Sequence, residues 1–179
     1  MKKRLITILC ILGMALPVLA GTGNIAPKAT ATASSSRDLG SGPDKAIDGL
    51  IHLDNAGEWV SGAIMPHWQQ LPFPWLQLDW EEEVTISRII LYDRPNKEAH
   101  TAGGDLYFSD GSRIGVVGIP NDGTPKVVEF EPKKVRWVKF VANDAIGSYI
   151  GLSEIEVYPP AEACTDFVSQ VKPFIETTK

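Results

Sequence analysis

Two acidic residues lie in short motifs near opposite ends of the chain. Asp48 belongs to the turn-like stretch Ala46-Ile47-Asp48-Gly49, and Glu154 to the run Gly151-Leu152-Ser153-Glu154-Ile155-Glu156-Val157-Tyr158. Calcium takes about six to eight oxygen ligands from carboxylates, carbonyls and water. If the turn and the closing run meet in space, the two carboxylates can share one such cation. A simpler role is also open, because Asp before Gly caps turn N–H groups and Glu154 suits a solvent-facing strand position.

A second group of residues suits recognition of a sugar. Trp68 follows His67 in Pro66-His67-Trp68-Gln69-Gln70, within a Gly- and Pro-rich stretch at residues 40–74 that shows no strand period. An indole beside hydrogen-bonding groups can pack on a pyranose ring. Long loops in compact domains are usually functional. Alternatively, Trp68 closes the end of the core beneath the loop.

Three more polar candidates follow later in the chain. Arg94 and Asn96 lie in Asp93-Arg94-Pro95-Asn96 after a strand-like run, and His100 precedes a Gly-rich stretch. Arginine presents a planar fork of donors that suits vicinal hydroxyls or a carboxylate. The alternative is an Asp93–Arg94 ion pair at the surface, which would contribute little.

The remaining tryptophans favour structural roles. Trp75, Trp80 and Trp137 fall on strand-like patterns, and Trp59 follows the acidic loop. Large aromatic side chains on such patterns usually pack in the core. We therefore expect these four residues to stabilise the fold rather than to bind a ligand.

The sequence motifs give little support for a catalytic function. The chain has no G-x-S-x-G, no H-E-x-x-H and no phosphate-binding glycine loop before a helix. A glycosidase pair of carboxylates remains a minor alternative, because acidic residues are frequent. We expect a protein that is not an enzyme.

The first residues predict export. Met1-Lys2-Lys3-Arg4 precedes an apolar run to Leu19, and Val18-Leu19-Ala20 fits a cleavage site. Residues 1–20 are therefore interpreted as a signal peptide, and we expect a secreted, periplasmic or cell-surface protein. Without them the chain holds 14 basic and 22 acidic residues, a net charge of −8. Such a charge argues against nucleic acid and anionic membranes as partners.

The rest of the chain is predicted to form one β domain followed by a tail. Alternating apolar and polar residues predict seven or eight short strands in a sandwich or jelly roll. The runs are at 75–80, 84–92, 105–108, 113–117, 126–131, 135–141 and 154–158, with a further run near 29–33. Asp110-Gly111 predicts a hairpin turn, and Pro132-Lys133-Lys134 is read as the link of another strand pair. The domain is placed at 21–160, and 161–179 as a loosely ordered tail or short helix.

The order of several motifs resembles the discoidin-like superfamily. They are Asn24-Ile25-Ala26, Ala46-Ile47-Asp48-Gly49, Glu58-Trp59, Trp75-Leu76-Gln77-Leu78-Asp79-Trp80 and the closing run from Gly151 to Tyr158. This group includes coagulation factor V/VIII C-type domains and family 32 carbohydrate-binding modules. The resemblance covers about residues 24–158. It implies an eight-stranded jelly roll, galactose-binding-domain-like, that binds glycans through loops at one end.

The resemblance also implies one structural calcium. Its ligands, carried over to this sequence, are the carbonyls of Lys45, Leu50 and Ser153 and the carboxylates of Asp48 and Glu154. Many members add a Thr two residues before the Trp, where this chain has Gly57. Glu58, Asn55 or water would have to replace that ligand. The alternative function is protein interaction or cell-surface adhesion through the same loops.

Overall fold

The computed structural model describes residues 23–52, 54, 56–62 and 73–161. The predicted signal peptide, the tail from 162 onward and the loop that holds His67 and Trp68 lie outside these residues. Within them the chain forms seven strands and two short 3-10 turns, and no helix there is long and apolar enough to span a membrane. The all-β prediction is confirmed.

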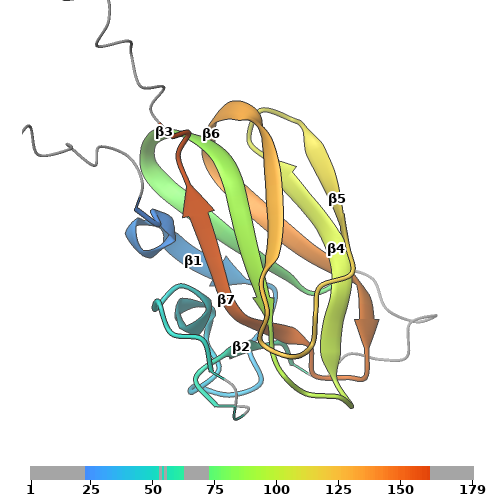
Figure 1. Cartoon of the computed structure of the whole chain (residues 1–179). Helices are drawn as coiled ribbons and strands as arrows, with labels where there is room; N and C mark the ends of the chain where they lie inside the picture. The colour runs from blue at the N-terminus through green and yellow to red at the C-terminus, as the bar shows by residue number, and fades with distance from the viewer. Residues whose placement is uncertain (1–22, 53, 55, 63–72, 162–179) are drawn as a thin grey trace, which may run out of the picture.

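The strands form one antiparallel sheet that folds over on itself (Figure 1). They are β1 (Thr30–Ala33), β2 (Trp59–Val60), β3 (Trp75–Asp93), β4 (His100–Phe108), β5 (Arg113–Val117), β6 (Lys126–Ile146) and β7 (Gly151–Tyr158). Their order is β2-β7-β3-β6-β4-β5, with β1 also paired to β3. The turns are η1 (Ala26–Lys28) and η2 (Pro43–Ala46).

Two strands are much longer than the sequence runs predicted. The runs at 75–80 and 84–92 are both part of β3, and those at 126–131 and 135–141 are both part of β6. The predicted link at Pro132-Lys133-Lys134 was therefore wrong. Residues 80–83 of β3 bulge between the pairs Asp79↔Trp137 and Val84↔Val135, and residues 130–132 of β6 oppose Ser87 alone. Bulges bend a strand without ending it and tolerate proline, so each strand passes from one layer to the other.

The core fills the space between the two layers. Its largest fully buried side chains are Trp59, Leu76, Leu78, Ile86, Ile89, Leu91, Leu106, Phe108, Phe140, Ile150, Leu152 and Ile155. Each contributes about 1.5–3 kcal/mol by leaving water. Trp59 and Trp80 are buried as expected, and each indole N–H donates to a carbonyl, of Ser35 and Ile25 respectively.

The other two strand tryptophans depart from the core prediction. Trp75 and Trp137 are only partly buried. The Lys139 ammonium lies 4.5 Å from the Trp75 ring centroid and 5.9 Å from that of Trp137. Trp75, Lys139 and Trp137 share one outward face, because residues two apart on a strand point the same way.

The hairpin predicted at Asp110-Gly111 is confirmed. β4 and β5 pair antiparallel, with Leu106 opposite Ile114. Gly111 closes the turn by donating its N–H to the Phe108 carbonyl at 3.0 Å, and it adopts a φ of 85°. Glycine enters this region without steric cost.

The two ends of the domain lie side by side. The Ile25 N–H donates to the Val157 carbonyl at 2.8 Å, and the Val157 N–H donates to Asn24 Oδ1 at 2.9 Å. In Figure 1 these ends are at the upper left, and the loops around 94–100 and 146–150 are at the opposite, lower end.

Candidate functional site

The acidic turn and the closing strand meet as predicted. Asp48 and Leu50 lie directly after η2, which contains Lys45 and packs against β7. The Gly49 N–H donates to Glu154 Oε1 at 3.3 Å, and Ser153 Oγ accepts the His52 N–H at 2.9 Å. All five residues named as calcium ligands are therefore in one corner of the molecule.

The Glu154 carboxylate has the properties of a cation ligand. It is fully buried, and its Oε2 has no hydrogen-bond partner among the described residues. Burial, with the nearby Asp48 and Glu156 charges, raises the pKa of Glu154 to about 8, against the effect of the Gly49 hydrogen bond. A buried, unpartnered carboxyl binds either a proton or a cation.

The rest of the donor set has to come from the backbone. Within the described ranges, no three His, Cys, Asp or Glu side chains gather closely enough to hold a metal. Asp48 Oδ1 already accepts the Leu50 N–H at 3.0 Å, which shapes the turn. Two carboxylates completed by carbonyls and water fit calcium better than they fit a transition metal.

Gly57 offers no side-chain ligand, and of the two Glu58 oxygens only Oε2 is without a partner among the described residues. A Cβ on Gly57 would lie 2.4 Å from His52 Nε2, so the imidazole fills the space that a larger residue would need. Glu58 is buried and pairs through Oε1 with Arg94 Nε at 2.7 Å. Asn55 lies outside the described residues.

Arg94 is the centre of a buried polar network, not an exposed side chain. Only 2% of its surface is exposed. Besides Glu58, its guanidinium donates to the carbonyls of Ala99 and Tyr149. Arg94 therefore joins three separate loops. The sequence alternative of an exposed Asp93–Arg94 pair is also wrong, because both residues are buried and the ion pair is with Glu58.

Asp93 joins the start of β4 to a further loop that contains Asn121. One of its oxygens accepts the Thr101 N–H at 3.0 Å and the other accepts Asn121 Nδ2 at 2.7 Å. Burial raises the pKa of Asp93 to about 7, although both hydrogen bonds lower it. At neutral pH this carboxyl is therefore partly protonated.

We define the loop rim as residues 94–100 and 146–150, the two loops that Arg94 joins. Asn96 Oδ1 accepts the N–H groups of Glu98 and Ala99, both at 3.0 Å, and shapes the first loop. His100 Nδ1 is 3.0 Å from the Asn96 carbonyl. A carbonyl only accepts, so Nδ1 carries the proton and a neutral His100 has Nε2 free as an acceptor.

The second loop of the rim adds a residue that the site prediction omitted. Tyr149 is 42% exposed, and its carbonyl is fixed by Arg94. Gly147 lets the two loops touch, since a Cβ there would lie 2.1 Å from the Glu98 carbonyl oxygen. The available signal was an aromatic residue two positions before the closing strand. Its exposure follows from the loop packing and could not be read from the chain.

Comparison with known proteins agrees with this fold. Residues 24–158 match the family model described as "Domain of unknown function (DUF7402)". The chain belongs to the DUF7402 family. No curated protein matches this DUF7402 chain.

Solved structures share the fold of the DUF7402 domain at low identity. Chitosan-binding module 1 of a chitosanase/glucanase from Paenibacillus sp. IK-5 is 22% identical, with 76% of this chain and 98% of that chain covered and a TM-score of 0.58. The family 32 module of NanJ from C. perfringens, solved with galactose, is 20% identical, covers 75% and 97%, and has a TM-score of 0.59.

A fucose-binding module from Streptococcus pneumoniae is similar as well. It is 20% identical, 79% of this chain and 98% of that chain are covered, and the TM-score is 0.56. These structures confirm the predicted β-sandwich fold for the DUF7402 domain.

Proposed function

We propose that this domain is a non-catalytic carbohydrate-binding module that recognises a glycan at the loop rim. The observation that carries the proposal is Tyr149, whose ring is exposed on a loop that the buried Arg94 holds in place. A tyrosine ring offers a rigid apolar face with a polar tip, and it loses little entropy on binding. The C–H face of a pyranose packs on such a ring.

Two polar side chains of the rim complete the arrangement. The amide Nδ2 of Asn96 is available as a donor, because its Oδ1 is used by the backbone. His100 Nε2 is an acceptor when the ring is neutral. A donor and an acceptor on the same loop can each bind a sugar hydroxyl. Arg94 acts in this proposal as a positioning residue, and contacts from His67 and Trp68 stay predictions.

The comparisons support the chemistry of the ligand. The matched structures are named for binding chitosan, galactose and fucose. They share the sandwich with this chain, although their low identity transfers no individual contact.

Export and calcium are parts of the same proposal. The basic and apolar start of the chain is that of a signal peptide, which would place the domain outside the cytoplasm. Calcium held by Asp48, Glu154 and the carbonyls of Lys45, Leu50 and Ser153 would neutralise the buried Glu154 charge. It would stabilise the turn after η2 against β7, without taking part in sugar binding.

A glycan array followed by calorimetry tests the proposal. A shallow rim competes with water for each hydroxyl, so we expect affinities of about 0.1–1 mM. Tyr149→Ala should lower the affinity about tenfold or more. Tyr107→Ala is a matched control, since Tyr107 is 36% exposed on β4 and outside the rim. Equal affinity in both variants would contradict the placement of the site, and Trp68→Ala then tests the neighbouring loop.

A further inference from the structure

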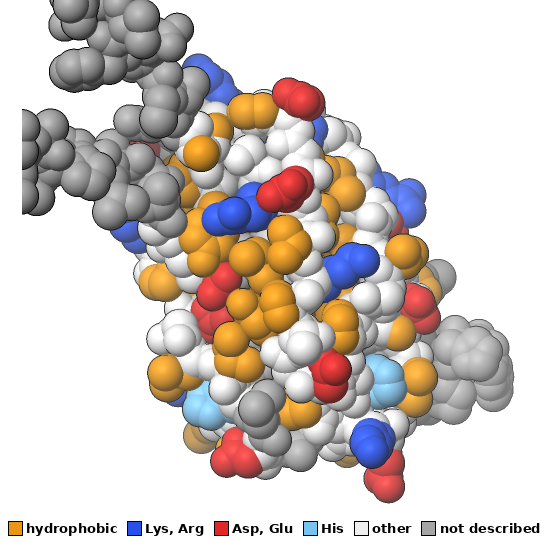
Figure 2. All heavy atoms as spheres, in the orientation of Figure 1, with side chains coloured by type: hydrophobic (Ala, Val, Ile, Leu, Met, Phe, Trp, Pro, Cys, Tyr) orange, Lys and Arg blue, Asp and Glu red, His pale blue; other side chains and the backbone are white. Residues whose placement is uncertain are grey.

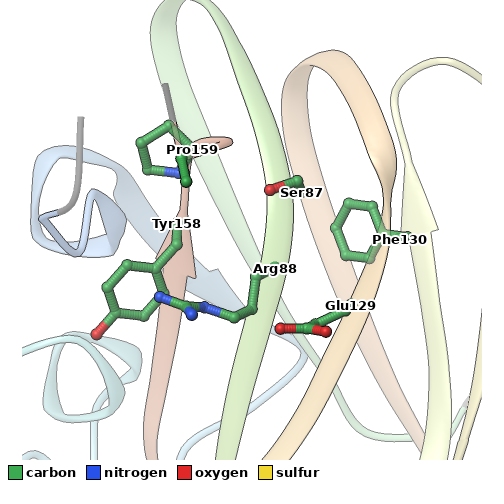
Figure 3. Close-up of a pocket in the computed structure, with 7 residues that line it drawn as sticks. Ser87, Arg88, Glu129, Phe130, Tyr158 and Pro159 are labelled. Atoms are coloured by element: carbon green, nitrogen blue, oxygen red, sulfur yellow. The ribbon is translucent and has the colours of Figure 1, made fainter. Parts of the chain in front are cut away.

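The outer face of β7, β3 and β6 has a hollow near the end opposite the loop rim. Its volume is about 380 Å³, and it is lined mainly by Ser87, Arg88, Glu129, Phe130, Tyr158 and Pro159. Figure 3 shows these side chains projecting from three neighbouring strands, and Figure 2 shows apolar side chains gathered over the same face with single charges between them. Small-molecule sites begin at about 300 Å³, so the hollow suits a molecule of monosaccharide size.

The strand register creates this arrangement. Arg88 of β3 is opposite Tyr158 of β7 on one side and opposite Glu129 of β6 on the other. Directly opposed residues on neighbouring strands project to the same face. The bulge at 130–132, where three residues oppose Ser87, adds Phe130 to the margin of the hollow.

Arg88 has no hydrogen-bond acceptor among the residues that the structure describes. Its guanidinium carbon lies 4.3 Å from the centroid of the Tyr158 ring, which orients the planar group. Its Nε is buried and has no hydrogen-bond partner among the described residues. None of the ion pairs among the described residues includes Arg88, although Glu129 lines the same hollow. A buried donor without a partner needs an explanation, and an acceptor bound in the hollow is one.

We propose that this hollow is a second ligand site, for a carboxylate-bearing sugar such as a hexuronic acid. The two oxygens of a carboxylate match the guanidinium fork of Arg88. The exposed Glu129 carboxylate can accept hydrogen bonds from sugar hydroxyls. Phe130 and Pro159 offer apolar surface to the C–H face of the ring.

The second site is independent of the rim. It shares no residue with positions 94–100 or 146–150, and Figure 1 places the C-terminal end of β7 at the other end of the sandwich. Failure of one site therefore leaves the other intact, and an acidic polysaccharide could bind both.

The test is an NMR titration of the full chain with galacturonate, and with galactose in parallel. We expect galacturonate, and not galactose, to shift the amides of Ser87, Arg88, Glu129 and Tyr158. Arg88→Gln should weaken galacturonate binding about tenfold or more, and Arg88→Lys should weaken it less, since it keeps the charge and loses the fork. The matched control is Arg136→Gln, which removes an exposed arginine outside the hollow.

Three outcomes would overturn the proposal. One is the absence of galacturonate-dependent shifts at this face at any soluble concentration. Another is equal binding by the wild type and a folded Arg88→Gln variant, with folding judged by melting temperature and amide dispersion. The third is that Arg88→Gln shifts the amides of residues 162–179 while galacturonate has no effect, which would assign the hollow to the chain's own continuation.

Discussion

Glu154 and Gly49 are 105 residues apart in the sequence, and a hydrogen bond of 3.3 Å joins the carboxylate of one to the backbone N–H of the other. This contact fixes the turn after η2 against the closing strand. It uses only one oxygen of a fully buried carboxylate. The other oxygen has no partner among the described residues, and it is where we predict that a cation binds.

Calcium should therefore stabilise the domain through Glu154. A ligand present at about 100 times its Kd adds about 2.7 kcal/mol to the free energy of unfolding, which corresponds to roughly 5–10 °C in Tm for a domain of this size. Differential scanning fluorimetry in calcium and in chelator measures the shift. We expect Glu154→Gln to abolish it.

Glu156→Gln is the matched control for that experiment. Glu156 is on the same strand, but its Oε2 accepts a hydrogen bond from the Tyr158 hydroxyl at 3.0 Å and not from the turn after η2. This variant should keep the calcium-dependent rise in Tm. The assignment of calcium to this corner would be contradicted if the calcium-dependent rise in Tm persists in Glu154→Gln, or if the wild type shows no rise.

The stability of the calcium-free domain should fall as pH rises from about 4 to 8. Burial raises the pKa of Asp93 to about 7 and that of Glu154 to about 8. A carboxyl with a raised pKa binds its proton more tightly in the folded state. Its contribution is complete below the pKa of the unfolded chain and is lost as pH rises through the folded value.

Asp93→Asn should flatten this dependence between about pH 4 and 7. One such group contributes a slope of up to about 1.4 kcal/mol per pH unit. Urea denaturation at several pH values in chelator gives the slope for each protein. An unchanged slope in Asp93→Asn would show that this carboxyl titrates normally.

Breaking the Arg94–Glu58 pair should be costly. Arg94→Met leaves the Glu58 carboxylate buried without its partner, a loss of about 3–5 kcal/mol. Arg37→Met is the control, because Arg37 pairs with Asp38 at 2.9 Å at the surface, where the two side chains are 39% and 51% exposed, and such pairs are worth about 0–1 kcal/mol. Chemical denaturation compares the two. Similar losses would mean that the buried network does not stabilise the loops.

Gly147→Ala should damage the loop rim specifically. Gly147 has a φ of 79°, and an added Cβ would lie 2.1 Å from the Glu98 carbonyl oxygen. Gly111→Ala is the control, with a φ of 85° and no atom within 4 Å of the added Cβ. The control should lose only about 1 kcal/mol from backbone strain. The Gly147 variant should lose more and should also bind glycan more weakly in calorimetry.

The strand pattern predicted the sandwich because inward and outward positions alternate along each strand. It failed to predict the lengths of β3 and β6, because Glu81-Glu82-Glu83 and Pro132-Lys133-Lys134 resemble turns by composition. In the structure, pairing with the neighbouring strand keeps both segments extended through bulges. Tertiary pairing of this kind leaves no local signal.

The candidate site, like the fold, could be predicted from the sequence only in part. The meeting of Asp48 with Glu154 followed from motif order, but Arg94 was mistaken for an exposed contact. Its burial depends on Glu58, 36 residues earlier, and on the carbonyl of Tyr149, 55 residues later. Such long-range partners decide whether a loop arginine faces solvent or supports other loops.

The hydrogen bonds that join Asn24 and Ile25 to Val157 have a mechanical consequence. Any polypeptide attached before or after the domain leaves from one end of the sandwich, so both attachments act as a single tether. The domain can then swivel about that point, which moves the loop rim at the opposite end through a wide volume. A pull on the tether therefore loads those few hydrogen bonds before it reaches the loop rim.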